Sequence, residues 1–147
     1  MSQVRNMLSL LAISVFFTFS LSAQEMSTEK AVAYLVEEQE SEGSWNREKR
    51  KQTVDTLESF RALQRVRGGE TALNNALKYF STLEEDTNEA LSSKLLILSN
   101  STADVSELTT KLISRQKQDG GWGLVDSRRG AIPDTILAIN ALLASQK

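Results

Sequence analysis

A seven-residue pattern that occurs twice in this 147-residue chain constrains its fold more than any other feature. Segments 39–45 (QESEGSW) and 116–122 (QKQDGGW) share Gln, an acidic residue, Gly and Trp at the same spacing. Trp and Gly are uncommon residues, and the only two tryptophans of the chain close these two segments. The match therefore indicates an internal repeat, which decides the architecture before any single element is considered.

The sequence on both sides of the pattern repeats as well. Leu35-Val36 precedes the first copy at the same offset as Leu112-Ile113 precedes the second. Farther along, Val54-Asp55-Thr56-Leu57 corresponds to Pro133-Asp134-Thr135-Ile136, and each opens a run in which apolar residues recur every three residues. This spacing is typical of amphipathic helices. Each unit is therefore predicted to be a helical hairpin, with a loop that contains Gly and Trp between its two helices.

A third, degenerate hairpin without the Gly-Trp loop lies between these two, so we expect an all-α chain of about three hairpins. The expected helices are Thr28–Glu40, a second one from Thr53 or Asp55 to Arg67, Thr71–Leu83, Glu89–Ser99, Val105–Gln118 and Ile132–Leu143, each bound being approximate. Glycine in a left-handed conformation ends such helices. Asp55 or Thr53 is expected to cap the second helix, and Pro133 lies either ahead of the last helix, with Asp134 as its cap, or within its first turn.

The first 23 residues have the composition of an export signal. Arg5 precedes an uncharged apolar run from Met7 to Phe19, and small residues follow up to Ala23. A short basic region, an apolar stretch and a small residue at the cut describe a secretory signal peptide. An uncleaved membrane anchor is the alternative, but the run is shorter than the roughly 20 residues that a spanning helix needs. We expect a signal peptide at 1–23, a secreted or periplasmic domain at 24–147, and no transmembrane span in the mature chain.

Composition excludes several classes of function. The chain has no Cys and no His, so disulfides, Cys/His zinc sites and His-dependent nucleophilic mechanisms are impossible. Its 17 basic and 19 acidic residues give a net charge of −2, which does not suit a nucleic-acid-binding protein. The carboxylates are not spaced as a metal site, so we predict neither a metal nor a cofactor.

The C-terminal copy, followed by Asp134-Thr135-Ile136-Leu137-Ala138, resembles the repeat that terpene cyclases and protein prenyltransferase β subunits share, and the copy at 39–45 is a weaker example. The resemblance covers about Thr28 to Leu143, although the middle hairpin departs from the pattern. It implies an α/α toroid, in which outer helices surround inner ones. It also implies that Gln bonds backbone groups at helix ends and that Trp stacks on it. The residues assigned to this structural motif are Gln39, Gly43, Trp45, Asp55, Gln116, Gly120, Gly121, Trp122 and Asp134.

The activities of that family have no matching residues here. The prenyltransferase zinc site needs Cys and His, and the cyclase acid needs an aspartate-rich motif, whereas Asp55 and Asp134 each stand alone. Either aspartate is then a general acid or, as we expect, a helix cap. Three hairpins make only a partial toroid, which leaves a groove open to water, and no catalytic residue is predicted.

The sequence therefore favours an exported, non-catalytic repeat protein that presents a groove to an apolar ligand or to a protein partner of the cell envelope. An alternative is a cyclase-like, prenyltransferase-like or polysaccharide-acting enzyme formed by oligomerisation, and another is a fragment of a longer toroid protein. The outward faces of the first and last helices carry Tyr34, Leu137 and Leu143. Because exposed apolar faces mark interfaces, a homodimer that completes the ring is also expected.

Overall fold

The computed structural model of the chain describes residues 24–125, 127 and 129–146, and the regular secondary structure of this part is all helical. Six helices are present and no strand occurs among the described residues, which confirms the predicted all-α class. The predicted signal peptide at 1–23 lies outside the described residues. None of the described helices combines the length and the apolar character that crossing a membrane requires.

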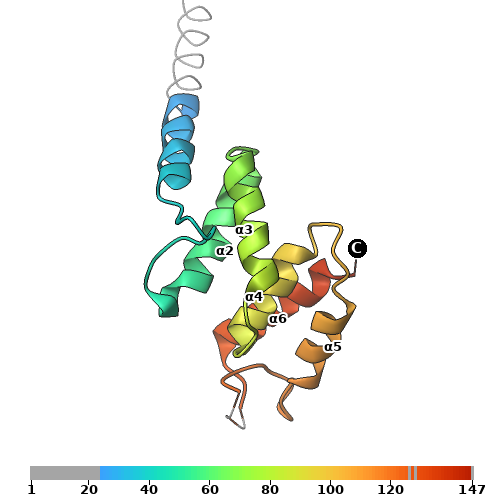
Figure 1. Cartoon of the computed structure of the whole chain (residues 1–147). Helices are drawn as coiled ribbons and strands as arrows, with labels where there is room; N and C mark the ends of the chain where they lie inside the picture. The colour runs from blue at the N-terminus through green and yellow to red at the C-terminus, as the bar shows by residue number, and fades with distance from the viewer. Residues whose placement is uncertain (1–23, 126, 128, 147) are drawn as a thin grey trace, which may run out of the picture. The chain divides into compact units, whose positions relative to one another are not determined.

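The chain divides into two units, residues 1–37 and residues 38–147. The first contains a helix at 24–37. The second contains five helices: α2 (Lys49–Val66), α3 (Glu70–Thr82), α4 (Asn88–Leu98), α5 (Ser106–Ser114) and α6 (Ile132–Ala144) (Figure 1). The following description of the core and of the site concerns the second unit.

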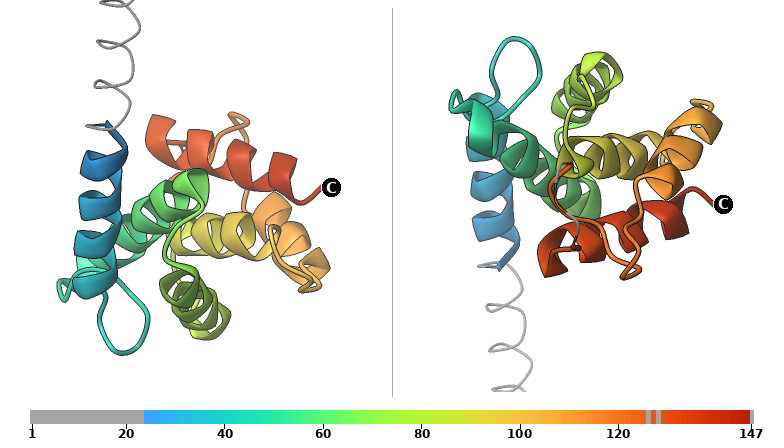
Figure 2. Two further views of the ribbon diagram at one scale, coloured as in Figure 1. Left: turned by 90° about the horizontal axis from the view of Figure 1, so that it is seen from above. Right: turned by 90° about the horizontal axis from the view of Figure 1, so that it is seen from below.

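Helix α4 is the central element of this unit. It contacts α2, α3, α5 and α6, and Figure 2 shows it alongside α6. Apolar side chains on all its sides are buried, among them Leu91, Leu95 and Ile97, and the small Ser92 and Ser93 between them are also fully buried. A helix that is buried on every side is typical of a protein core. The hairpin that lacks the repeat motif thus provides the helix on which α2, α5 and α6 pack.

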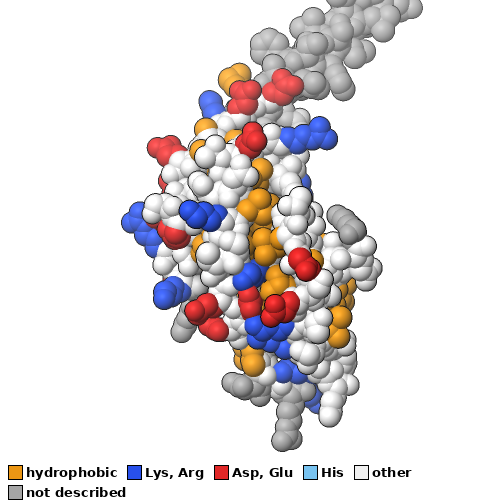
Figure 3. All heavy atoms as spheres, turned by 45° about the vertical axis from the view of Figure 1, so that its right-hand side comes forward, with side chains coloured by type: hydrophobic (Ala, Val, Ile, Leu, Met, Phe, Trp, Pro, Cys, Tyr) orange, Lys and Arg blue, Asp and Glu red, His pale blue; other side chains and the backbone are white. Residues whose placement is uncertain are grey.

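The core around α4 has two parts. One cluster joins α4 to the last hairpin and consists of Leu91, Leu95, Leu112, Trp122, Ala138 and Ala141. The other belongs to α2 and α3, where Leu63, Ala76 and Phe80 have no exposed surface. Apolar side chains also remain at the surface, as a band on the face drawn in Figure 3.

The cap predicted for the second helix was wrong, and of the two arrangements expected for the last helix one is found. Helix α2 begins at Lys49, before Thr53 and Asp55, because the Asn46 side chain accepts the N–H of Glu48 at 2.9 Å and starts the helix one turn earlier. Helix α6 begins at Ile132 with Pro133 in its first turn, which is the second of the two expected arrangements, and no side chain caps it, so Asp134 is not its cap. Asp55 and Asp134 therefore lie inside helices, where each carboxylate is available for another role.

The first helix of the last hairpin is also shorter than predicted. Helix α5 ends at Ser114 instead of Gln118, because Gln116 and Lys117 bond to the loop that follows. The first helix of the chain ends at 37, so Gln39 likewise belongs to a loop.

Candidate functional site

The two copies of the repeat fold into the same loop. In each, the Gln side-chain amide donates to the carbonyl of the glycine four residues later, at 2.9 Å from Gln39 to Gly43 and at 2.8 Å from Gln116 to Gly120. Both glycines have a positive φ, +97° and +82°, which favours glycine over other residues. The residue after each Gln donates its backbone N–H to the residue before each Trp, at 2.9 and 2.8 Å. The sequence repeat is therefore also a repeat of hydrogen bonds.

A threonine of the following helix holds each tryptophan. The backbone N–H of Trp45 donates to Oγ1 of Thr56 at 2.9 Å, and that of Trp122 donates to Oγ1 of Thr135 at 3.0 Å. Both tryptophans are only 4% exposed, and the indole N–H of Trp122 also donates to the carbonyl of Leu112 at 2.7 Å. Sequence reasoning assigned Asp55 and Asp134 to the motif and missed these threonines, although the Asp-Thr pair was part of the match.

Gly121 has a packing requirement of its own. A Cβ atom at this position would lie 3.0 Å from Oγ1 of Thr135 and 3.0 Å from Cα of Gly130, both closer than ordinary contacts. Asp119 fixes the same stretch, because its carboxylate accepts the N–H groups of Gly121 and Gly130 at 3.1 and 2.9 Å. These backbone bonds lower the pKa of Asp119.

The two motif aspartates have different surroundings. The Asp55 carboxylate accepts a hydrogen bond from Nδ2 of Asn46 at 2.6 Å and so fastens the first loop to α2. Asp134 lies at the mouth of a cleft and has no hydrogen-bond or ion-pair partner among the described residues. Burial raises the pKa of the Asp134 carboxyl. Of the nine motif residues, only Asp134 lines this cleft.

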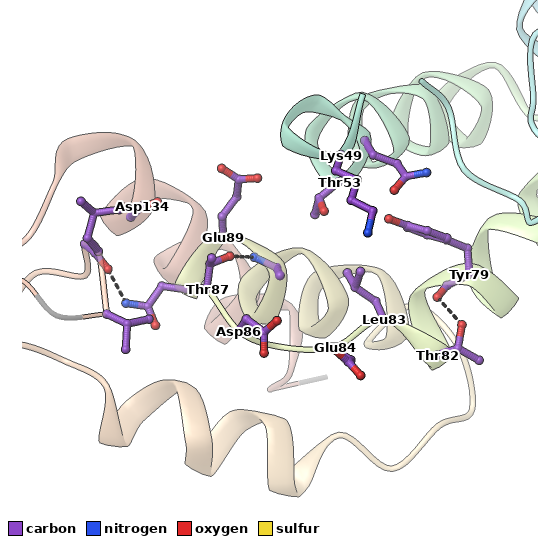
Figure 4. A pocket seen from close by; sticks show the side chains of 16 residues that line it. Lys49, Thr53, Tyr79, Thr82, Leu83, Glu84, Asp86, Thr87, Glu89 and Asp134 are labelled. Atoms are coloured by element: carbon purple, nitrogen blue, oxygen red, sulfur yellow. Dashed lines mark hydrogen bonds between the residues drawn. The ribbon is translucent and has the colours of Figure 1, made fainter. Parts of the chain in front are cut away.

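The cleft has a volume of about 600 Å³ and opens where α2, α4 and α6 begin (Figure 4). Its walls are the first turns of these three helices, the end of α3 with the link to α4, and residues 123–125 of the second Trp loop. Because the wall comes from all three hairpins of the chain, the cleft exists only when they are packed together.

Carboxylates dominate the charge of the cleft. Among the described residues that line it, Glu84, Asp86, Glu89 and Asp134 are acidic and Lys49 alone is basic. Burial raises the pKa of Glu89, and the charge of Asp134 raises it further. Two carboxyl groups that repel each other in a partly buried place are a recurrent mark of functional sites.

Asn88 forms the buried side of the cleft. It is 2% exposed, and its amide Nδ2 donates to the carbonyl of Gly123 at 2.6 Å, which ties α4 to the second Trp loop. Its Oδ1 is buried and accepts no hydrogen bond within the described part of the chain. A buried acceptor without a donor is costly, so this atom is suited to a group that brings a donor.

Tyr79 lines the opposite end of the cleft. Its side chain points toward Lys49 and Thr53, as Figure 4 shows. Burial raises the pKa of the Tyr79 hydroxyl, and a hydrogen bond with Thr53 partly opposes this shift. The phenol therefore stays protonated at neutral pH.

Glu85 fixes the link between α3 and α4 that forms one wall. Its carboxylate accepts hydrogen bonds from Lys94 of α4 and, at 2.7 Å, from Lys111 of α5. These two lysines lower the pKa of Glu85. Lys94 also donates to the carbonyl of Leu83 at 2.9 Å. The link beside the cleft is thus held by charge-assisted bonds to two helices.

No three carboxylates in the described ranges are grouped as metal ligands would be. No family model matches the chain, and no curated protein or solved structure is similar to it at a significant level.

Proposed function

We propose that this chain is an exported, non-catalytic α/α-repeat protein that binds a small, positively charged ligand in the cleft at the starts of α2, α4 and α6. Export rests on the basic, apolar and small-residue pattern of residues 1–23. The ligand chemistry rests on the lining of the cleft. An anionic ligand would meet four carboxylates, and an isoprenoid would leave them without partners.

The surplus of hydrogen-bond acceptors is the observation that carries the ligand assignment. Four carboxylates and the unpartnered Oδ1 of Asn88 line the cleft, and the amide of Asn88 is already used by Gly123. An ammonium group has three donors and no acceptor, so it complements such a lining. Between Glu89 and Asp134 it would also remove the repulsion that raises the pKa of Glu89.

A partial α/α toroid is the arrangement that we infer for the three hairpins. The second helices of successive hairpins contact each other, α2 with α4 and α4 with α6. The first helix of a hairpin contacts the second helix of the preceding one, as α3 does with α2 and α5 with α4. An inner row of second helices and an outer row of first helices agree with these contacts.

Proton transfer is a second candidate function, and the raised pKa of Asp134 favours it. A carboxyl group whose pKa is raised holds its proton more tightly than an ordinary one, which is the direction that general acid catalysis needs. In this alternative, ring completion by oligomerisation would exclude water from the cleft. Turnover of a substrate, lost in Asp134→Asn, distinguishes this candidate from simple binding.

Spermidine is a suitable probe of the proposed binding. At fixed ionic strength it should raise the melting temperature of the chain, and Glu89→Gln combined with Asp134→Asn should abolish the rise. Glu107→Gln is the matched control, because Glu107 is an exposed acidic residue of α5 that does not line the cleft. An equal response of the double variant and of the control would refute the ligand assignment.

A further inference from the structure

The outer face of α6 carries a stripe of exposed apolar side chains. Ile132 is 78% exposed, Ile136 56%, Ile139 47% and Leu143 60%. Residues spaced by four, three and four positions lie on one face of a helix. The opposite face is buried, since Ala138 and Ala141 have no exposed surface. Helix α6 is therefore apolar on both faces, and only one of them is covered by the described residues.

The repeat shows what covers this face in the first hairpin. Aligning Thr56 with Thr135 places Leu57 opposite Ile136 and Phe60 opposite Ile139 in the alignment. Leu57 and Phe60 are only 3% and 4% exposed, and their helix α2 contacts α3 and α4. The corresponding face is thus buried in α2 and exposed to solvent in α6.

The two repeat loops also differ in whether a neighbouring helix covers them. The Gln39 amide donates not only within its loop but also to the carbonyl of Ala72 in α3, at 2.9 Å. Asn75 of α3 donates to Oε1 of Gln39 at 3.3 Å, and a Cβ atom at Gly43 would lie 2.2 Å from the carbonyl oxygen of Asn75. The first loop is therefore docked on the first helix of the next hairpin.

The second loop has the same shape but no such neighbour. Gln116 donates only to Gly120 of its own loop among the described residues, and a Cβ atom at Gly120 would meet nothing within 4 Å. Gln116 and Gly120 are both exposed. Together with Ile136 and Ile139 they form what we name the open face: a surface that in the first hairpin receives a helix.

We propose that the open face binds a second copy of this chain, whose helix 24–37 takes the place that α3 takes on the first hairpin. The contacts of α3 with α2 and of α5 with α4 define the rule that the first helix of a hairpin packs on the preceding second helix. Helix 24–37 corresponds in the sequence repeat to the first helix of a hairpin, and it exposes Tyr34 and Val36. This interface is independent of the ligand proposed for the cleft.

Such a contact is head-to-tail, because the open face of one copy meets a different surface of the other. When the open face of each copy binds helix 24–37 of the other, the two copies form a closed dimer with six hairpins in total. A further hydrogen bond is expected in each contact, from the Gln116 amide to a carbonyl of the arriving helix, as the Gln39 amide makes to Ala72.

Sedimentation of the chain across micromolar concentrations tests the proposal. The chain should have the mass of a dimer, and Ile136→Glu with Ile139→Glu should raise the dissociation constant at least tenfold. Ile113→Glu is the matched control, because Ile113 is 53% exposed on α5 and lies outside the open face. Circular dichroism should show that all variants are folded, as expected for substitutions at exposed positions. A monomer throughout, or a dimer that Ile136→Glu and Ile139→Glu leave intact, would overturn the proposal.

A mixing experiment identifies the second surface. Tyr34→Glu should also dissociate the dimer, since it alters the opposite end of the same contact. An equimolar mixture of this variant with the Ile136→Glu, Ile139→Glu variant should then form a heterodimer, because one intact contact of the two is restored. If Tyr34→Glu remains dimeric, α6 pairs with something other than helix 24–37, and the proposed arrangement is wrong.

Discussion

The backbone N–H of Trp122 donates to the hydroxyl of Thr135 at 3.0 Å, and this hydroxyl returns a bond to the carbonyl of Trp122 at 3.2 Å. The pair joins the second repeat loop to the helix that follows it. Trp45 and Thr56 make the same two bonds, at 2.9 and 3.4 Å. The two copies of the sequence repeat thus share the same pair of hydrogen bonds between a threonine hydroxyl and the tryptophan backbone. Substitution of the threonine tests the contribution of this hydroxyl.

Thr135→Val should destabilise the chain by about 1–3 kcal/mol, the range for leaving a buried donor without an acceptor. Valine keeps the shape of the side chain but cannot accept the N–H of Trp122. Thr135→Ser, which retains the hydroxyl, should lower the free energy of unfolding much less. Urea unfolding measures both, with Thr71→Val at an exposed site of α3 as the control. Equal losses for the Val and Ser variants would mean that the hydroxyl contributes nothing.

Trp122→Ala should cost about 3–5 kcal/mol, as removal of a large buried aromatic side chain does. Trp122 belongs to the main core cluster, and its indole also bonds the carbonyl of Leu112. This loss is a large part of the roughly 5–15 kcal/mol by which an ordinary domain is stable. Leu124→Ala, two residues away and 75% exposed, should change it by less than about 0.5 kcal/mol.

Gly43→Ala should destabilise the chain more than Gly120→Ala. Both glycines have a left-handed φ, so alanine is strained at either position by roughly 1 kcal/mol. Only at Gly43 would the new Cβ also collide with a backbone carbonyl, that of Asn75. Thermal unfolding at a concentration where the chain is monomeric measures the difference. Losses of equal size would contradict the docking of the first loop on α3.

Glu85→Gln should lower stability by about 1–3 kcal/mol, because the amide can accept from only one of the two lysines and carries no charge to pair with either. The pKa of Glu85 is lowered in the folded chain, so the stabilisation that it provides is present above the unfolded value of 4.5. It disappears as the pH falls through the folded pKa. The difference in the free energy of unfolding between the wild type and Glu85→Gln should therefore decrease at acidic pH. Glu58→Gln, at a 61% exposed partner of Arg61, should cost less than about 1 kcal/mol and serves as the control.

The sequence predicted the helices better than their contacts. Periodic apolar residues indicate which residues are helical, and six helices were found close to the expected positions. The central role of α4 did not follow from its hairpin, which lacks the motif. The signal was present in its own composition: an apolar helix with the small residues Ser92 and Ser93 can be approached from every side.

The site was predictable only in part. Tryptophan and glycine were recognised because they are rare, whereas Thr56 and Thr135 were overlooked beside the aspartates, whose role as caps was a plausible but wrong interpretation. Glu89 could not be identified, because it becomes a neighbour of Asp134 only when the starts of α4 and α6 meet at the cleft. Periodicity describes one helix at a time and says nothing about which helix ends converge.

Titration of the carboxyl carbons of Glu89 and Asp134 by NMR, with and without spermidine, tests the central claim most directly. Without spermidine both groups should titrate above their usual values of 4.5 and 3.8, because burial favours the protonated form of each and the charge of Asp134 adds to the shift of Glu89. A cation that binds the ionised pair competes with protons, so spermidine at constant ionic strength should lower both pKa values and should bind more tightly as the pH rises through them. Unchanged titration curves at saturating spermidine, with the Glu107 carboxyl as an internal reference, would contradict the proposed cation site.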